Sequence, residues 1–125
     1  MVGLPGETEE LFMETYNFIS RLKPAFIHIF PYSRRPGTKA AAMKDQVPEE
    51  IKHERSQKLI ALGEKMSQEY EDSLMAKGKT FEVLLEEPGV DESGKPGCFG
   101  FSREYIKFFY PTENPNDFQN SIVEM

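Results

Sequence analysis

The spacing of apolar residues over residues 48–78 predicts one long, uninterrupted α-helix. Pro48 suits the first helical position, where its missing N–H is not needed, and Gly78 suits the C-terminal cap. The helix would be roughly 40 Å long at about 1.5 Å per residue. We therefore expect it to connect two separate bodies, residues 1–47 and residues 79–125. Apolar side chains at helical spacing form one stripe along it: Leu59, Leu62, Met66, Tyr70 and Leu74.

The first body begins with the stretch GLPGETEE, at residues 3–10. Two glycines around a proline are typical of the turn between a strand and a helix, yet only Met1 and Val2 precede the turn. Thr8 is a good N-cap, and the glutamates after it fall in a first turn, where the helix dipole favours them. We expect a helix over residues 8–22, preceded by a strand of which only the end is present.

The stretch AFIHIFPYS, at residues 25–33, alternates in the manner of a β-strand. Its aromatic face suits the lumen of a barrel, and its aliphatic face suits packing under helices. Two apolar faces predict a buried parallel strand, so the loop, helix and strand are interpreted as a truncated βαβ unit. The aromatic face carries Phe26, His28 and Phe30. The aliphatic face carries Ala25, Ile27 and Ile29.

The second body, residues 79–125, is β in character. TFEVLLEE alternates, a turn rich in Gly, Pro and Asp is expected at 88–97, and CFGFS and EYIKFFY follow as strands. SIVEM ends the chain in a further strand. Short strands with tight turns indicate a small antiparallel barrel or part of one. The predicted fold class is therefore α+β: the end of a βα barrel, a long linker helix and a small β-barrel-like domain.

Composition excludes several classes of protein. The net charge of −6 argues against a protein that coats nucleic acid, because phosphate binding needs a basic surface. The chain has a single cysteine, Cys98, so it cannot form an internal disulfide or, by itself, a Cys-based zinc or iron–sulfur site. No apolar run approaches the length of a membrane span, and the N-terminus lacks a signal-peptide pattern. We expect a cytoplasmic protein with no membrane partner.

Three features of the first body could carry function, and each has a plain structural alternative. The glycine loop can place backbone amides and a helix N-terminus against a ligand, or it can simply form a tight turn. His28 can face a cofactor, or it can be a hydrogen-bonded core histidine. Arg34 and Arg35 can contact phosphate, or they can be solvated charges of a loop. No Ser/His/Asp set, carboxylate pair or metal-spaced cluster is present, so no catalytic or metal-binding residue is predicted.

The combination of these stretches is more specific than any of them alone. MVGLPGETEELFMET, HIFPYSRRPGTKAAAM, QVPEEIKHERSQKLIAL and GKTFEVLLEE follow one another in this order. Together they resemble the radical-SAM methylthiotransferases that act on transfer RNA. The HIFPYSRRPGT stretch is most similar to the branch that thiomethylates threonylcarbamoyladenosine beside the anticodon. It is less similar to the branches that act on isopentenyladenosine and on a ribosomal-protein aspartate.

This resemblance implies a C-terminal fragment of a longer enzyme. Residues 1–47 would be the end of the radical-SAM barrel, 48–78 the linker helix, and 79–125 a truncated TRAM domain, the RNA-binding β domain of this family. The resemblance also implies that the parent uses S-adenosylmethionine and two [4Fe–4S] clusters. Since the family's cluster cysteines are absent, the chain alone should bind no cluster and be inactive. The resemblance places the following residues near S-adenosylmethionine, with His28 facing the same lumen: Gly3, Leu4, Pro5, Gly6 and Glu7.

Transfer RNA is the implied partner of the parent. The loop after the predicted barrel strand carries Arg34, Arg35 and Lys39, and loops of this kind hold active-site groups in such barrels. In the β domain, Arg103, Tyr105 and Lys107 offer phosphate and stacking contacts. Residues 79–125 nevertheless carry a net charge of −5, which is unusual for an RNA-binding barrel.

Two further expectations follow. The truncated βαβ unit would leave unpaired strand edges and exposed apolar surface, which predicts self-association of the chain. The alternative to the enzyme fragment is a stand-alone acidic adaptor that binds a protein through its β domain and uses no cofactor.

Overall fold

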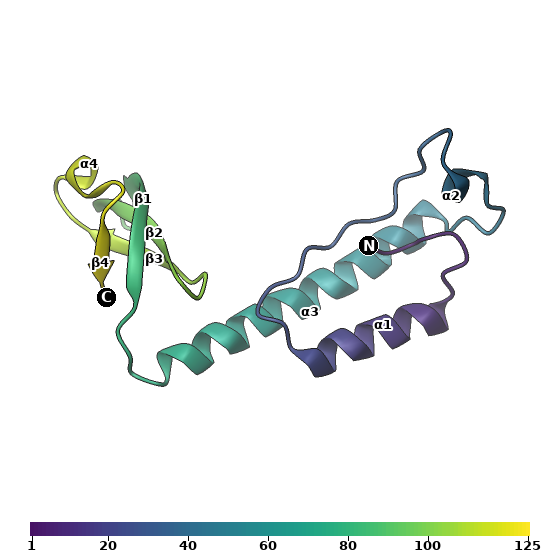
Figure 1. Ribbon diagram of the computed structural model, residues 1–125, viewed down its shortest axis with the longest axis horizontal. Helices are drawn as coiled ribbons and strands as arrows, with labels where there is room; N and C mark the ends of the chain where they lie inside the picture. The colour runs from purple at the N-terminus through teal and green to yellow at the C-terminus, as the bar shows by residue number, and fades with distance from the viewer. The chain divides into compact units, whose positions relative to one another are not determined.

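A computed structural model describes all 125 residues and divides them into two compact units, Met1–Ser73 and Leu74–Met125. The first unit is helical and the second is a β-sheet unit, so the predicted α+β class is confirmed (Figure 1). The domain boundaries inferred from the sequence, 1–47, 48–78 and 79–125, stay a prediction.

The first helix, α1, spans Glu9–Leu22 as its caps predict. The Thr8 hydroxyl accepts a hydrogen bond from the Leu11 amide at 3.2 Å, which satisfies one of the free amides at the helix start. Lys23 ends the helix in a left-handed conformation, with φ of 49°, and its amide bonds to the Ile19 carbonyl.

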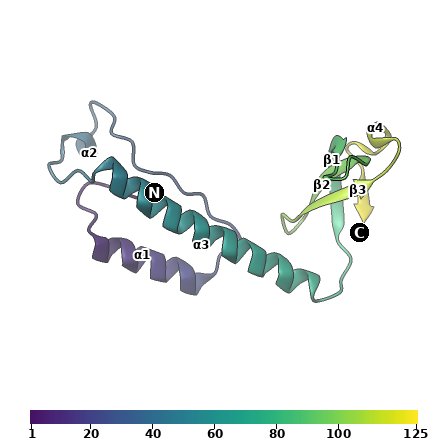
Figure 2. The same ribbon diagram turned by 180° about the vertical axis from the view of Figure 1, so that it is seen from behind.

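The long helix, α3, spans Glu49–Met75, within the range that its pattern predicts. It is more than a connector, because its apolar stripe builds the core of the first unit. Leu59, Leu62 and Met66 are buried there with Val2 and Phe12. Burying one such side chain stabilises the fold by about 1.5–3 kcal/mol. Figures 1 and 2 show α1 and the extended segment of residues 25–31 running alongside α3.

The strand expected at residues 25–33 is not a ladder strand, and this part of the prediction is wrong. The segment is extended, but its one β-bridge is parallel and joins Val2 to Pro31. Val2 donates to the Phe30 carbonyl at 2.9 Å and accepts from the Tyr32 amide at 2.7 Å. A ladder needs a partner strand along its length, and the bridge at Val2 is the one strand-type pairing of this segment.

The predicted alternation of the segment is confirmed. Ile27 and Ile29 pack against the core of the first unit, whereas Phe26, His28 and Phe30 are exposed. The Ser67 hydroxyl of α3 donates to the Ala25 carbonyl at 2.8 Å. The segment is therefore held against α3 by the Ile27 and Ile29 side chains and one hydrogen bond, and to Val2 by a single bridge.

The loop after this segment contains a short helix that the sequence did not reveal. This helix, α2, spans Lys39–Ala42 and starts at Thr38, whose hydroxyl accepts from the Ala41 amide. A single turn presents no apolar period, so its signal is limited to the N-cap.

The second unit is a four-stranded antiparallel sheet in the order β3-β2-β1-β4. Its strands are β1 (Glu82–Val90), β2 (Pro96–Ser102), β3 (Lys107–Pro111) and β4 (Ile122–Glu124), and a short helix, α4 (Pro115–Phe118), precedes the last strand. The four predicted strands are present. The connection from β3 through α4 carries the chain to the opposite edge, where β4 pairs with β1 (Figure 1).

Three details of the sheet differ from the expected pattern. β1 continues to Val90, so the first turn is shorter than the stretch 88–97, and α4 has no apolar period that would predict it. Tyr105 adopts a left-handed conformation, with φ of 63°, so EYIKFFY contributes a strand only from Lys107 onward.

Close approach of β1 and β2 requires a glycine at Gly100, because a Cβ there would collide with the Leu84 carbonyl.

Candidate functional site

The glycine loop of residues 3–7 has a shape that requires its glycines. Gly3 and Gly6 have φ of 74° and 84°, in the left-handed region that side chains disfavour. Gly3 is also buried against α3, where an added Cβ would collide with the side chain of Lys52. Gly6 instead faces open space. The loop thus has one glycine fixed against the helix and one glycine at its open side.

Three amides of this loop already have acceptors within the protein. Gly3 donates to a carboxylate oxygen of Glu7 at 2.9 Å, Gly6 donates to the Asp45 carbonyl at 2.7 Å, and Glu7 donates to the Leu4 carbonyl at 2.9 Å. These bonds favour the structural reading of the loop as a tight turn. What the loop presents to a ligand is an apolar tip, in which Leu4 is 43% exposed.

Two cations of α3 contact this loop and the neighbouring segment at Tyr32, and the sequence analysis identified neither of them. Lys52 and Arg55 are only 2% and 5% exposed. The Lys52 ammonium donates to the Tyr32 carbonyl at 3.1 Å and to Glu49 at 2.6 Å. The signal was in the spacing. Positions 52 and 55 extend the stripe of Leu59, Leu62 and Met66 toward the start of α3, but the stripe predicted from the sequence contained apolar residues only.

His28 does not lie in a hydrogen-bonded core. Its ring is exposed between two phenylalanines, edge-on to Phe26 at 4.7 Å and stacked with Phe30 at 6.3 Å between ring centroids. The three side chains form a row on the face of the extended segment that turns away from α3.

The basic loop of residues 34–44 brings some, but not all, of its cations together. The Arg34 guanidinium donates to the Ala41 carbonyl at 2.9 Å and so caps α2. Arg34 and Lys39 line one shallow depression of about 650 Å³, and Arg35 is not among its lining residues. Arg34, Arg35 and Lys39 are all exposed, but Arg34 also makes a structural contact with α2.

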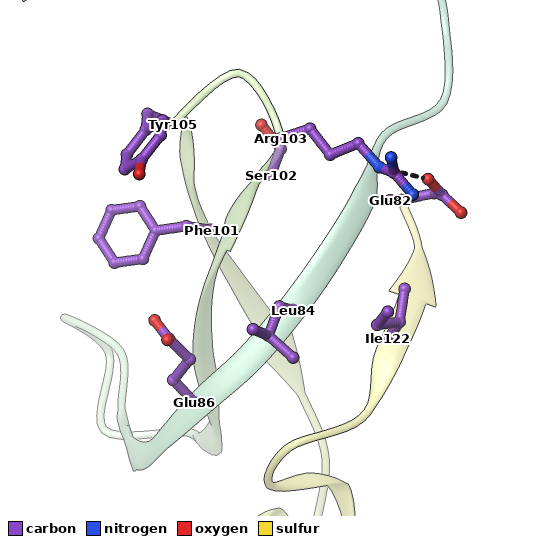
Figure 3. A pocket seen from close by; sticks show the side chains of 8 residues that line it. All are labelled: Glu82, Leu84, Glu86, Phe101, Ser102, Arg103, Tyr105 and Ile122. Carbon is purple, nitrogen blue, oxygen red and sulfur yellow. Dashed lines mark ion pairs between the residues drawn. The ribbon is translucent and has the colours of Figure 1, made fainter.

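The β unit carries a hollow on its outer face, where three apolar side chains lie side by side across three strands (Figure 3). Leu84 stands opposite Phe101 on β2 and Ile122 on β4. The hollow encloses about 510 Å³. Its rim holds Arg103 and also Tyr105, which is 87% exposed.

The charges around this hollow do not form a simple phosphate site. Arg103 is paired with Glu82 at 2.8 Å, and Glu86 lies on the same rim (Figure 3). Lys107 is not among the lining residues, and its ammonium sits 4.5 Å from the centroid of the Phe99 ring. The structure therefore brings together Arg103 and Tyr105, but not Lys107, of the three residues predicted in this domain.

No metal-binding group is apparent in the chain. No cluster of three or more His, Cys, Asp or Glu side chains could hold an ion. Cys98 is buried in β2, and burial raises the pKa of its thiol, with a further contribution from the Glu87 carboxylate. None of the helices is both long enough and apolar enough to span a bilayer.

Comparison with known proteins identifies the class. The chain is homologous to enzymes named tRNA methylthiotransferases, in one case over its whole length, which confirms the predicted family resemblance. Threonylcarbamoyladenosine tRNA methylthiotransferase MtaB of Bacillus subtilis is 43% identical over 125 residues, which are 100% of this chain and 27% of the relative. No family model matches the chain.

Two further relatives agree with this assignment. MtaB of Aquifex aeolicus is 46% identical over 85 residues, which are 68% of this chain and 20% of the relative. The tRNA-2-methylthio-N(6)-dimethylallyladenosine synthase of Thermoanaerobacter sp. is 45% identical over 95 residues, or 76% of this chain and 20% of the relative. The chain thus spans about a quarter of the length of these relatives or less. The comparisons do not favour a stand-alone adaptor.

Proposed function

We propose that the intact protein containing this chain adds a methylthio group to C2 of N6-threonylcarbamoyladenosine, next to the anticodon of tRNA. The observation that carries the proposal is the 43% identity to the Bacillus subtilis enzyme over every residue of the chain. The relative named for dimethylallyladenosine is 45% identical over 95 residues, so the support for threonylcarbamoyladenosine as the substrate is the alignment of the Bacillus subtilis enzyme over the whole chain.

The test is to delete the gene for the intact protein and to analyse the nucleosides of total tRNA by mass spectrometry. We expect methylthio-threonylcarbamoyladenosine to disappear, its unthiolated precursor to accumulate, and the intact gene to restore the modification. Loss of the methylthio-dimethylallyl nucleoside instead would contradict the substrate. No change in either nucleoside would contradict the enzyme assignment and favour the acidic adaptor.

In this proposal the intact enzyme uses S-adenosylmethionine and two [4Fe–4S] clusters, as the family resemblance implies. The exposed, apolar Leu4 and the open space beside Gly6 fit one edge of a cofactor such as S-adenosylmethionine. Pro5 and Glu7 complete that loop, and His28 is a further candidate contact. A cluster does not fit the residues of this chain, because it needs several thiolates and Cys98 is buried and alone.

The 125-residue chain alone is therefore expected to be inactive. Anaerobic treatment with iron and sulfide should give no stoichiometric cluster absorbance and no cleavage of S-adenosylmethionine. A stable four-iron cluster on the isolated chain would contradict this expectation.

The partner in this proposal is tRNA, which also agrees with the predicted cytoplasmic location. Arg34, Arg35 and Lys39 would hold the RNA backbone from the first unit, and a planar guanidinium can donate two parallel hydrogen bonds to a phosphate. The β unit would contribute a second set of contacts: Arg103, Tyr105 and Lys107.

The phosphate contacts are tested in the intact enzyme by measuring tRNA affinity against salt concentration. Arg35→Gln is the sharpest variant, because Arg35 is exposed, whereas Arg34 also supports the loop through Ala41. Loss of one phosphate contact should weaken binding and lower the salt slope by roughly one unit. Lys65→Gln, at an exposed position of α3, is the matched control. An unchanged slope for Arg35→Gln would mean that Arg35 does not meet RNA.

Self-association of the chain also stays a proposal. Its support is the exposed row of Phe26, His28 and Phe30 on a segment with a single bridge to its neighbour. Sedimentation at increasing concentration should show dimers or larger species, and the variant Phe26→Ser with Phe30→Ser should reduce them. A compact monomer at high concentration would contradict the proposal.

A further inference from the structure

The glycine loop is anchored from behind by one buried arginine of α3. The Arg55 guanidinium donates from Nη1 to a carboxylate oxygen of Glu7 at 2.7 Å and to the Glu7 carbonyl at 3.1 Å. It also donates from Nε and Nη2 to one carboxylate oxygen of Glu9, at 3.3 and 3.2 Å. Its central carbon lies 5.4 Å from the centroid of the Phe12 ring. The nitrogens of the guanidinium thus donate hydrogen bonds to both Glu7 and Glu9.

The same carboxylate oxygen of Glu7 that receives Arg55 also receives the backbone amide of Gly3. Arg55, Glu7 and Gly3 therefore form one chain of hydrogen bonds from the long helix to the first residue of the loop. Since the Glu7 side chain is only 14% exposed, water has little access to replace these bonds.

We propose that Arg55 is a positioning residue that keeps the Gly3–Glu7 loop in the shape that meets S-adenosylmethionine, an inference that rests on the proposed function. Arg55 does not contact the cofactor in this scheme, because it approaches the loop through Glu7 and Glu9. Its effect is on the fraction of molecules in which Leu4 and Gly6 are correctly placed. When a ligand binds only one conformation, its apparent affinity falls in proportion to the fraction of molecules in that conformation.

The geometry explains why this position needs arginine. The guanidinium fork reaches a backbone carbonyl and two carboxylates with fixed donor directions, whereas a lysine ammonium is a point charge on a flexible chain. Lysine can keep the charge next to Glu7, but it cannot reproduce all of these bonds. A methionine of similar length leaves the Glu7 carboxylate partly buried without its cation.

The experiment uses the intact, cluster-loaded enzyme and three variants: Arg55→Met, Arg55→Lys and the matched control Lys58→Met. Lys58 also faces Glu9 from the same helix, at 3.7 Å, but makes no bond to Glu7. Titration calorimetry measures the affinity for S-adenosylmethionine, and hydrogen exchange measures the protection of the Gly3 and Gly6 amides. Thermal unfolding of each variant is followed in parallel.

We expect Arg55→Met to weaken S-adenosylmethionine binding roughly ten- to a hundredfold, in line with the loss of a hydrogen-bonded charge. Exchange of the Gly3 amide should accelerate in the same variant. Arg55→Lys should lie between Arg55→Met and the wild type, and Lys58→Met should match the wild type in both measurements. Adding Glu7→Gln to Arg55→Met should weaken binding little further, because both residues belong to one chain of bonds.

Three outcomes would overturn the inference. Unchanged affinity with unchanged exchange would mean that Arg55 does not hold the loop. Faster exchange with unchanged affinity would leave Arg55 as a purely structural residue, while the nucleoside test could still support the proposed function. Failure of the wild-type enzyme to bind S-adenosylmethionine would overturn both proposals together. If Arg55→Met does not fold, the comparison of Arg55→Lys with Lys58→Met gives the decision.

Discussion

In the first unit Lys52 and Arg55 lie inside the protein, whereas in the β unit Lys79 and Arg103 lie on the surface. The side chains of the buried pair are 3% and 6% exposed, and those of the surface pair are 50% and 78% exposed. All four contact carboxylates. The difference lies in the environment, because a buried charge must keep its partners, whereas water can replace the partner of an exposed one. The same residue types therefore hold a loop in place in the first unit but form exposed ion pairs on the surface of the β unit.

The largest effect that this comparison predicts is on the stability of the first unit. Arg55→Met leaves the carboxylate of Glu7 without its cation, and removing one partner of a buried pair costs about 3–5 kcal/mol. Glu7 is not completely enclosed, so we expect a value near the lower end. The measurement is hydrogen exchange of the slowest amides of α3. A loss as small as that of a surface pair would contradict the contrast between the two units.

The next effect concerns the glycine that packs against the other buried cation. Gly3→Ala introduces a Cβ at a left-handed position and against the Lys52 side chain. The left-handed backbone alone costs about 1–2 kcal/mol, and the collision adds to it. Gly6→Ala is the matched control, because it has a similar φ but open space around it. Equal losses in thermal unfolding for the two variants would show that contact with Lys52 is unimportant.

A smaller effect is expected for the surface pair of the β unit. Arg103→Gln breaks the contact with Glu82, and exposed pairs contribute about 0–1 kcal/mol. The change should shrink further at high salt, because screening acts on exposed charges. Thermal unfolding at low and high ionic strength checks this expectation. A loss comparable to that of Arg55→Met would mean that surface exposure does not decide the strength of these pairs.

The smallest predicted effect is a pH dependence of the β unit. Hydrogen bonds from Ser93 and Lys95 lower the pKa of Asp91 below its ordinary value of 3.8, and the bond from Lys79 lowers the pKa of Glu104 below 4.5. A carboxyl whose pKa is lower in the folded state stabilises that state above its unfolded pKa. This contribution is then lost as the pH falls through the folded pKa.

We therefore expect slightly faster hydrogen exchange in the β1–β2 hairpin below about pH 4, after correction for the intrinsic exchange rate. Asp91→Asn should flatten this dependence, while Glu92→Gln, next to it in the turn, should not. A hairpin whose protection rises on acidification would contradict the sign of the shifts.

The sequence predicted those elements whose period is long enough to be recognised. α1 and α3 extend over several turns, and the four strands alternate or end at clear turn residues. The four-residue helices α2 and α4 are too short to show a period. The segment at 25–33 has the composition of a strand, but pairing depends on a neighbour, and composition alone does not supply one.

The candidate site was predicted less completely than the fold. The glycines of the loop and its N-cap, Thr8, were found because special backbone conformations and caps favour particular residues. Arg55 was not found, because a charged residue on a long helix is usually solvated. Its burial depends on Glu7, which lies 48 residues away, and such a pairing becomes visible only when the helix and the loop are placed together.

The buried thiol of Cys98 gives the β unit a built-in reporter. Because the chain has no other cysteine and this side chain is 0% exposed, a thiol-reactive dye can couple only after the sheet has opened around β2. When opening and closing are fast compared with coupling, the labelling rate measures the equilibrium between closed and open forms of the sheet. The labelling rate of one thiol thus reports the local opening of this unit. An RNA that binds the closed form, as proposed, should lower this rate.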